Sequence, residues 1–145
     1  MNILALETSH DCALVAANVD EKIQVRSALR LDEPRALVRD LAIYTARALE
    51  NAGWNFDDVD GLAVGIGPGS WTSLRIALST WKTLSLAREI PLAGVPSFDA
   101  VALAAKNSNL VSTQSLLVVT GRCQPGEIYA KTFACDEKIQ ALTEE

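Results

Sequence analysis

The chain has 145 residues, a formal net charge of −5 and 49% hydrophobic residues, and no run of its apolar residues approaches a membrane-spanning length. This length suits one compact domain, or one domain with part of another. The acidic balance, without a cluster of Lys and Arg, disfavours a protein that grips RNA by itself.

Cysteine and histidine usage points to a reduced compartment. The three cysteines, Cys12, Cys123 and Cys135, are widely spaced and never form a CxxC pair. They are better interpreted as thiols of a cytoplasmic protein than as disulfides or zinc ligands. His10 is the only histidine, so HExxH-type metal chemistry is excluded. The N-terminus has no basic region before its apolar stretch, and we expect no secretory signal.

The first third of the chain predicts an antiparallel meander followed by a helix. Strands are expected over residues 2–6, 12–19 and 23–29, with a polar turn, Glu7-Thr8-Ser9-His10-Asp11, after the first. That turn has two interpretations: a phosphate-binding turn, or an ordinary hairpin in which Thr and Ser satisfy turn amides. Asp32-Glu33-Pro34 predicts a helix start, and the helix runs to about Ala52, before Gly53.

The most informative stretch is Gly65-Ile66-Gly67-Pro68-Gly69-Ser70-Trp71-Thr72-Ser73-Leu74-Arg75. It follows a short apolar strand at residues 62–64 and precedes a helix predicted over residues 72–88. Ser70 or Thr72 is a natural N-cap for that helix. A strand, a glycine turn and a helix N-terminus form a concave anion site, although a tight connection without a ligand fits as well.

The helix over residues 72–88 is apolar or small-sided around most of its circumference. One sheet can cover only one side of a helix, so the other side is expected to meet a neighbouring helix or another subunit. On the preceding helix, Ala36, Ile43 and Ala46 lie among charged residues, which is typical of an ordinary tolerated surface but is also compatible with a partner's helix.

The rest of the chain suggests a second, similar unit. After a strand at 92–95 and a helix at 98–106, residues 107–115 read as a linker, and strands follow at 116–119 and 127–134. The pentapeptide Asp20-Glu21-Lys22-Ile23-Gln24 recurs as Asp136-Glu137-Lys138-Ile139-Gln140 after the corresponding strand. We therefore predict a first domain over 1–108, and a linker with a partial second domain over 109–145.

The glycine stretch is similar to the GxGPGSFTGxR segment of the TsaB (YeaZ) family, with Trp71 and Ser73 as departures. The resemblance implies an α/β fold of the ribonuclease-H-like, actin-like type. This fold has a mixed five-stranded sheet with flanking helices, followed by the opening hairpin of a second similar unit. Glu7-Thr8-Ser9 matches the family's first turn with Glu in place of Asp. Thr120-Gly121-Arg122 matches a DAR segment with Thr in place of the acid.

The resemblance implies a non-catalytic scaffold of the machinery that makes threonylcarbamoyladenosine in tRNA. It would pair with and activate a TsaD-type transferase, alongside a TsaE-type ATPase, and would reach tRNA only indirectly. A homodimer through the same helices would compete. The implied partner surface comprises Ile43, Arg47, Ile76, Thr80, Thr83 and Ala87. The implied phosphate-type turn comprises Glu7, Thr8, Ser9, Gly65, Gly67, Pro68, Gly69, Ser70, Thr72 and Arg75.

The resemblance implies no catalytic residue, no metal and no resident cofactor, with weak Mg-ATP binding only in a complex. The alternative is a small-molecule phosphotransferase of the same fold, in which Glu7 acts as base or holds a metal-bound water. Peptidase activity, a label attached to the wider family, is disfavoured because no metal motif or nucleophile turn is present. The family's second domain is larger, so we expect a shortened homologue or a truncated product.

Overall fold

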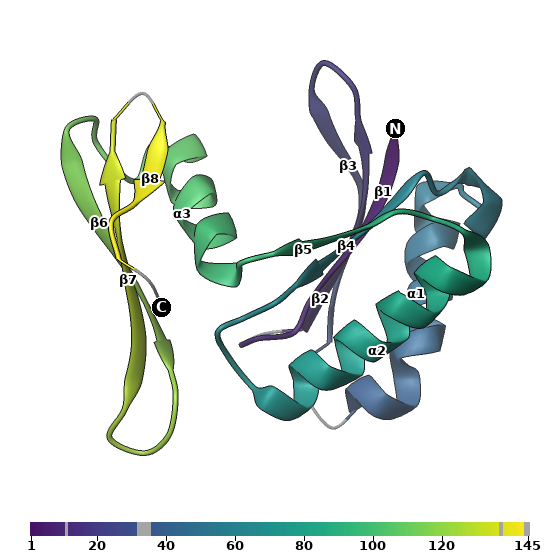
Figure 1. The fold of residues 1–145 in the computed structure, drawn as a ribbon. Coiled ribbons are helices and arrows are strands. Elements are labelled where there is room, and N and C mark those ends of the chain that lie inside the picture. Colours follow the sequence, from purple (N-terminus) through teal and green to yellow (C-terminus); the bar gives the residue numbers. More distant parts are fainter. Residues whose placement is uncertain (11, 32–35, 137, 144–145) are drawn as a thin grey trace.

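The polypeptide forms two separate sheets with one helix between them, as the computed structural model in Figure 1 shows. The structure describes residues 1–10, 12–31, 36–136 and 138–143. The first sheet has five strands in the order β3-β2-β1-β4-β5, and the second has three in the order β6-β7-β8. Within the first sheet, β1 pairs antiparallel with β2 and parallel with β4.

The elements follow the chain in a simple order. They are β1 (Asn2–Glu7), β2 (Cys12–Val19), β3 (Ile23–Leu31), α1 (Ala36–Ala52), a 3₁₀ turn (Phe56–Asp58), β4 (Gly61–Gly65), α2 (Trp71–Arg88), β5 (Leu92–Val95), α3 (Ser97–Asn107), β6 (Ser115–Arg122), β7 (Ile128–Cys135) and β8 (Ile139–Ala141). No helix among the described residues is long and apolar enough to cross a membrane.

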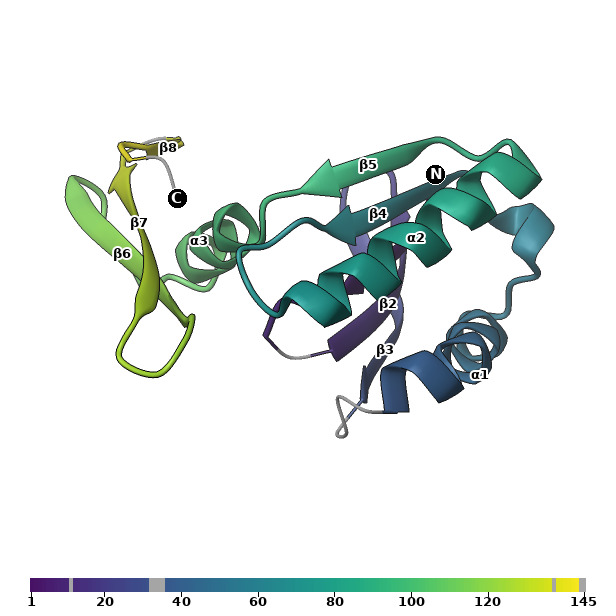
Figure 2. The same cartoon turned by 60° about the horizontal axis from the view of Figure 1, so that its bottom comes forward.

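The main core lies between the first sheet and the two long helices, α1 and α2, which both cover the same face of that sheet (Figure 2). Alternate strand residues point to this face because side chains in a strand have a period of two. Leu4, Leu6 and Leu14 are almost completely buried there. Trp81 of α2 is fully buried above them, and its indole N–H lies 3.5 Å from the carbonyl oxygen of Leu4.

A second core joins α3 to the second sheet. Phe98 and Ala102 of α3 pack with Val119 of β6 and Phe133 of β7. An ion pair of 2.9 Å between Lys131 and Asp99 lies at the same seam. The predicted boundary at residue 108 stays a prediction, and α3, which lies before it, shares its core with the strands that follow.

The predicted fold class is confirmed: a mixed five-stranded sheet carries flanking helices, and a meander of a second unit follows. The predicted helix start at Asp32-Glu33-Pro34 lies outside the described residues. The repeated pentapeptides occupy matching places, at the turns that open β3 and β8. In each, the Asp N–H faces the Lys carbonyl, at 3.4 Å for Asp20 and 3.3 Å for Asp136.

The two tryptophans of α2 differ in burial, and this difference provides a test of the core. Trp81→Ala should lower the free energy of unfolding by about 3–5 kcal/mol, because it empties the centre of the core. Trp71→Ala, at a side chain that is 73% exposed, should change it by less than about 0.5 kcal/mol. Urea denaturation measures both. Equal effects of the two substitutions would contradict this packing.

Candidate functional site at the glycine turn

The glycine turn meets the turn after β1 because their strands are parallel neighbours. Leu6 of β1 is in register with Val64 of β4, so the two strands end at the same edge of the sheet. The turn after β1 therefore lies beside the loop that leads into α2. The Ser70 N–H donates a hydrogen bond of 2.8 Å to the carbonyl oxygen of Ser9 and joins the two turns directly.

The carboxylate of Glu7 connects three segments of the chain. Its Oε1 accepts a hydrogen bond of 2.6 Å from the Ser9 N–H. Its Oε2 accepts one of 2.7 Å from the hydroxyl of Ser97, the first residue of α3. That hydroxyl also accepts a hydrogen bond of 3.2 Å from the Gly67 N–H, and the Ser97 N–H donates to the Gly67 carbonyl at 2.8 Å. We call this set of contacts the Glu7 latch.

At two positions of the turn only glycine fits, because neighbouring atoms lie too close for a Cβ. A Cβ at Gly65 would lie 2.6 Å from the carboxyl carbon of Glu7. A Cβ at Gly69 would lie 2.5 Å from the carbonyl carbon of Ser9. Gly67 has a φ of +96°, which L side chains rarely adopt. Each glycine thus has a structural reason that involves no ligand.

The N-terminus of α2 differs in detail from the sequence prediction. Ser70 does occupy the N-cap position, but its side chain makes no capping hydrogen bond. Its hydroxyl lies 3.0 Å from the Ser73 hydroxyl. Thr72 and Arg75 are exposed, and the Arg75 guanidinium lies 6.0 Å from the ring centre of Trp71. The Glu7 latch, rather than a cap, holds the turn in place.

A cavity of about 660 Å³ lies between the glycine turn and the β6–β7 hairpin. Its lining contains no acidic residue: Ser9, His10, Gly69, Ser70, Trp71, Thr120, Gly121, Arg122, Cys123, Gln124 and Tyr129. Thr120 thus faces this cavity at the position where the resemblance places an acid. The lining residues offer hydroxyls, main-chain groups and one guanidinium, but no carboxylate that could hold a magnesium ion.

His10 and Tyr129 shape the walls of this cavity. The His10 ring stacks on Phe98 with 6.1 Å between ring centres, and it lies directly against Gly121, where no side chain would fit. A hydrogen bond with Cys123 raises the pKa of Tyr129, and the charges of Cys123 and Glu127 act in the same direction. Through its contacts with Phe98 and Gly121, His10 joins the first turn to α3 and β6.

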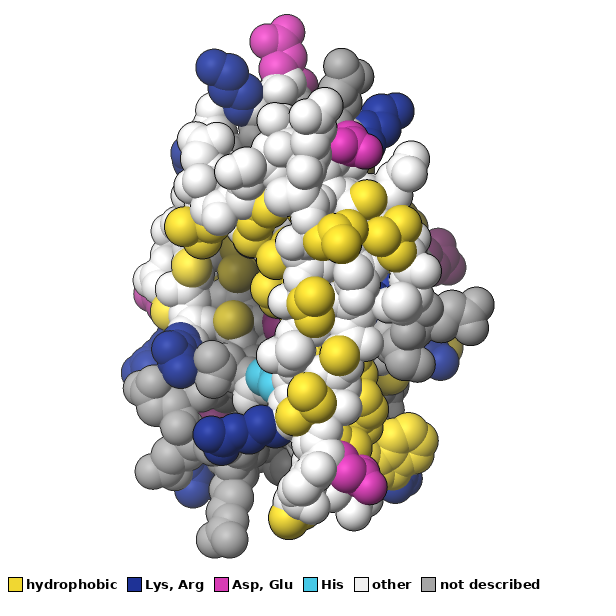
Figure 3. All heavy atoms as spheres, turned by 90° about the vertical axis from the view of Figure 1, so that its left-hand side faces the viewer, with side chains coloured by type: hydrophobic (Ala, Val, Ile, Leu, Met, Phe, Trp, Pro, Cys, Tyr) yellow, Lys and Arg dark blue, Asp and Glu magenta, His cyan; other side chains and the backbone are white. Residues whose placement is uncertain are grey.

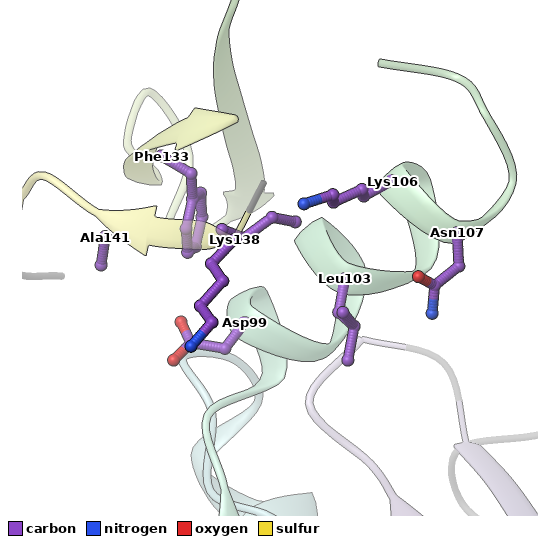
Figure 4. Close-up of a pocket in the computed structure, with 8 residues that line it drawn as sticks. Asp99, Leu103, Lys106, Asn107, Phe133, Lys138 and Ala141 are labelled. Carbon is purple, nitrogen blue, oxygen red and sulfur yellow. The ribbon is translucent and has the colours of Figure 1, made fainter. Parts of the chain in front are cut away.

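A second cavity, of about 450 Å³, lies between α3 and the strands β7 and β8 (Figure 4). Leu103 and Phe133 line it, and the ammonium group of Lys138 points toward Asp99 (Figure 4). Lys106 beside it donates a hydrogen bond of 2.7 Å to the carbonyl oxygen of Asp136. No residue of the predicted site lines this cavity, which belongs to the seam between α3 and its sheet.

The predicted partner surface lies on α1 and α2, away from the glycine turn. Ile43, Arg47, Thr83 and Ala87 are exposed, whereas Ile76 and Thr80 are half-buried. Their role in an interface stays a prediction. Leu86 of α2 is not among the six residues of the predicted partner surface, although it is 81% exposed and is the most exposed large hydrophobic side chain among the described residues. No signal in the sequence pointed to Ser97, whose hydroxyl bridges Glu7 and Gly67.

Comparisons with known proteins give consistent matches. The family model of TsaD, tRNA N6-adenosine threonylcarbamoyltransferase, matches residues 34–135. The chain is 34% identical over 137 residues to the tRNA N6-adenosine threonylcarbamoyltransferase of Methylobacterium sp. (strain 4-46), covering 82% of this chain and 39% of that protein. It is 30% identical over 137 residues to the tRNA threonylcarbamoyladenosine biosynthesis protein TsaB of Escherichia coli K12, covering 94% of this chain and 57% of that protein.

A solved structure shares the fold. YeaZ from Pseudomonas aeruginosa superimposes with a TM-score of 0.81 at 21% identity, over 99% of this chain and 65% of that one. At this identity the match shows the fold alone. The chain spans 39% of the transferase and 57% of the TsaB protein to which it is similar.

The latch predicts a specific loss of stability. Ser97→Ala leaves a Glu7 oxygen and the Gly67 N–H without their partner, and should lower the free energy of unfolding by about 1–3 kcal/mol. Ser79→Ala is the matched control, because the exposed Ser79 hydroxyl bonds only its own helix, at the Arg75 and Ile76 carbonyls. We expect less than about 0.5 kcal/mol there. Chemical denaturation compares the two, and a Ser97→Ala effect no larger than the control would argue against the latch.

Proposed function

The chain belongs to the family of TsaD and TsaB (YeaZ) proteins of tRNA threonylcarbamoyladenosine biosynthesis, and from this membership we propose that it acts there as a non-catalytic scaffold subunit. In this proposal it pairs with a TsaD-type transferase and activates it. A TsaE-type ATPase would complete the assembly, and tRNA would be reached only through the partners. The observation that carries the proposal is the Glu7 latch. In it, the only acidic side chain of the phosphate-type turn is held by hydrogen bonds from the protein itself, which supports a non-catalytic role.

The engagement of both Glu7 oxygens supports a structural role for the turn. A carboxylate that serves as a base or holds a metal-bound water must direct a lone pair at its ligand, and protein hydrogen bonds to both of its oxygens restrict the orientation in which it can do so. Here Oε1 accepts from Ser9 and Oε2 accepts from Ser97. Thr120 supplies no second acid on the other side of the cavity. Both observations speak against the phosphotransferase alternative, and we propose that the lone chain binds Mg-ATP weakly or not at all.

The exposed residues on the outer surface of α1 and α2 support the proposal that a partner binds there. Ile43 is 54% exposed on α1, and Leu86 is 81% exposed on α2. The exposed Arg47 and Lys82 lie on the same two helices. Exposed apolar side chains suit a partner that offers a hydrophobic helix face. Thr83 lies within this surface, and its short side chain would allow a close helix-to-helix approach.

Thr83→Arg tests the proposed surface. The hydroxyl of Thr83 bonds only its own helix, to the Ser79 carbonyl at 2.8 Å, and the residue is exposed. The arginine can therefore reach water in the free protein, and folding should survive. In an interface, burying it without a partner should weaken capture of the TsaD-type homologue by at least about tenfold. Co-purification and reconstituted tRNA modification measure the effect.

The matched control is Thr113→Arg, at an exposed threonine of the segment between α3 and β6. It adds the same charge outside the proposed surface and should capture the homologue like the parent protein. Failure of the parent to capture the homologue would contradict the scaffold proposal. Equal capture by Thr83→Arg and the parent would instead remove this face as the interface.

A further inference from the structure

The chain packs as two bodies with separate hydrophobic cores. One core lies under α1 and α2, the other joins α3 to β6 and β7, and the two clusters share no residue. Among the described residues, the elements that pack most closely also fall into two groups. The first body is β1–β5 with α1 and α2, and the second body is α3 with β6–β8. The bodies meet at the connection from β5 to α3 and at the two turns described above.

The start of α3 is attached to the first body at a single place. The Ser97 hydroxyl donates to Oε2 of Glu7 at 2.7 Å, and the Ser97 N–H donates to the Gly67 carbonyl at 2.8 Å. Both bonds lie next to Pro96, the one residue between β5 and α3. Bonds that lie close to an axis of rotation have a short lever arm. The Glu7 latch therefore fixes where the second body begins, but it opposes a rotation about this point only weakly.

His10 supplies a contact with a second element of the second body. Its ring stacks on Phe98 of α3, with 6.1 Å between ring centres and 29° between the planes. The same ring lies directly against Gly121 of β6, where a Cβ would collide with the imidazole. Its Nδ1 lies 3.2 Å from the Ser9 hydroxyl of its own turn. The imidazole thus spans the gap between the first turn and β6.

The space around His10 is not densely packed. The cavity of about 660 Å³ and a second cavity of about 420 Å³ both include Ser9, His10 and Thr120 in their linings, so both lie between the bodies. Figure 3 views the molecule from the side of the second sheet and shows a hollow in its surface with hydrophobic side chains around it. Because cavities rather than packed side chains adjoin the ring, His10 carries the contact between its turn and β6.

We propose that His10 sets the angle between the two bodies, and that residues 95–97 are the hinge about which they turn when its contact is lost. Hinges are formed by a few residues at the ends of elements, and these residues end β5 and begin α3. The imidazole acts as a spacer that stops the second body from rotating about its attachment at Ser97. Since both cavities lie between the bodies, the same side chain sets their width. The inference does not depend on the scaffold role.

Residual dipolar couplings of the backbone amides test the proposal in the folded 145-residue chain. In the parent, the couplings of both bodies should fit one common alignment tensor, because the His10 contact holds the bodies in one orientation. In His10→Ala they should require two tensors of different magnitude, because the bodies then reorient independently. The amide shifts of Leu4 and Phe133, one from each core, should stay unchanged and show that both bodies remain folded.

Two further variants separate the spacer from other effects of the substitution. Gly121→Ala should also require two tensors, because its Cβ takes the place of the imidazole and displaces the ring from β6. Gln124→Ala is the matched control, since this exposed side chain lines the same 660 Å³ cavity from the second body but is not part of the His10 contact. It should keep the single tensor of the parent.

Three results would overturn the proposal. The first is a His10→Ala protein whose couplings still fit one tensor, which would show that other contacts set the angle. The second is a parent whose bodies already need different tensors. The third is the loss of either core in His10→Ala, because His10 belongs to neither hydrophobic cluster.

Discussion

The arrangement of the molecule depends on one half-buried carboxylate at the end of β1, that of Glu7. This side chain ends β1, holds the N–H of Ser9 in its own turn, and accepts the hydroxyl of Ser97 at the start of α3. Through Ser97 it also fixes Gly67. The first turn, the glycine turn and the helix that carries the second sheet are thus tied at one point. The Glu7 carboxylate thus serves as a structural junction between three segments of the chain.

The two units of the chain show the same opening with different coverage. The meander β1-β2-β3 continues into β4 and is covered by α1 and α2, so its inner leucines are buried. The meander β6-β7-β8 repeats the strand order and the turn, but α3 covers its opposite face. The face that is the core of the first unit is therefore open in the second. Leu116 and Val118, which lie on this face of β6, are therefore exposed.

Much of this could be predicted from the sequence, because the signals were local. Alternating apolar residues gave the strands, Gly53 ended α1, and the repeated pentapeptide marked equivalent turns. The latch could not be predicted, since Glu7 and Ser97 are 90 residues apart and nothing in either segment names its partner. The packing of α3 could not be predicted either. Its apolar residues indicate that one face is buried, but they do not indicate which of the two sheets covers that face.

The structural role of Glu7 is tested most directly at its own carboxylate. Its ¹³C resonance, assigned by its absence in Glu7→Gln, can be followed while Mg²⁺ and ATP are added to the folded chain. Because each oxygen accepts a hydrogen bond from the protein, we expect the resonance to stay unchanged up to millimolar ligand. A saturable shift at micromolar ligand would show that the carboxylate serves a bound nucleotide or its metal, and would contradict the structural junction.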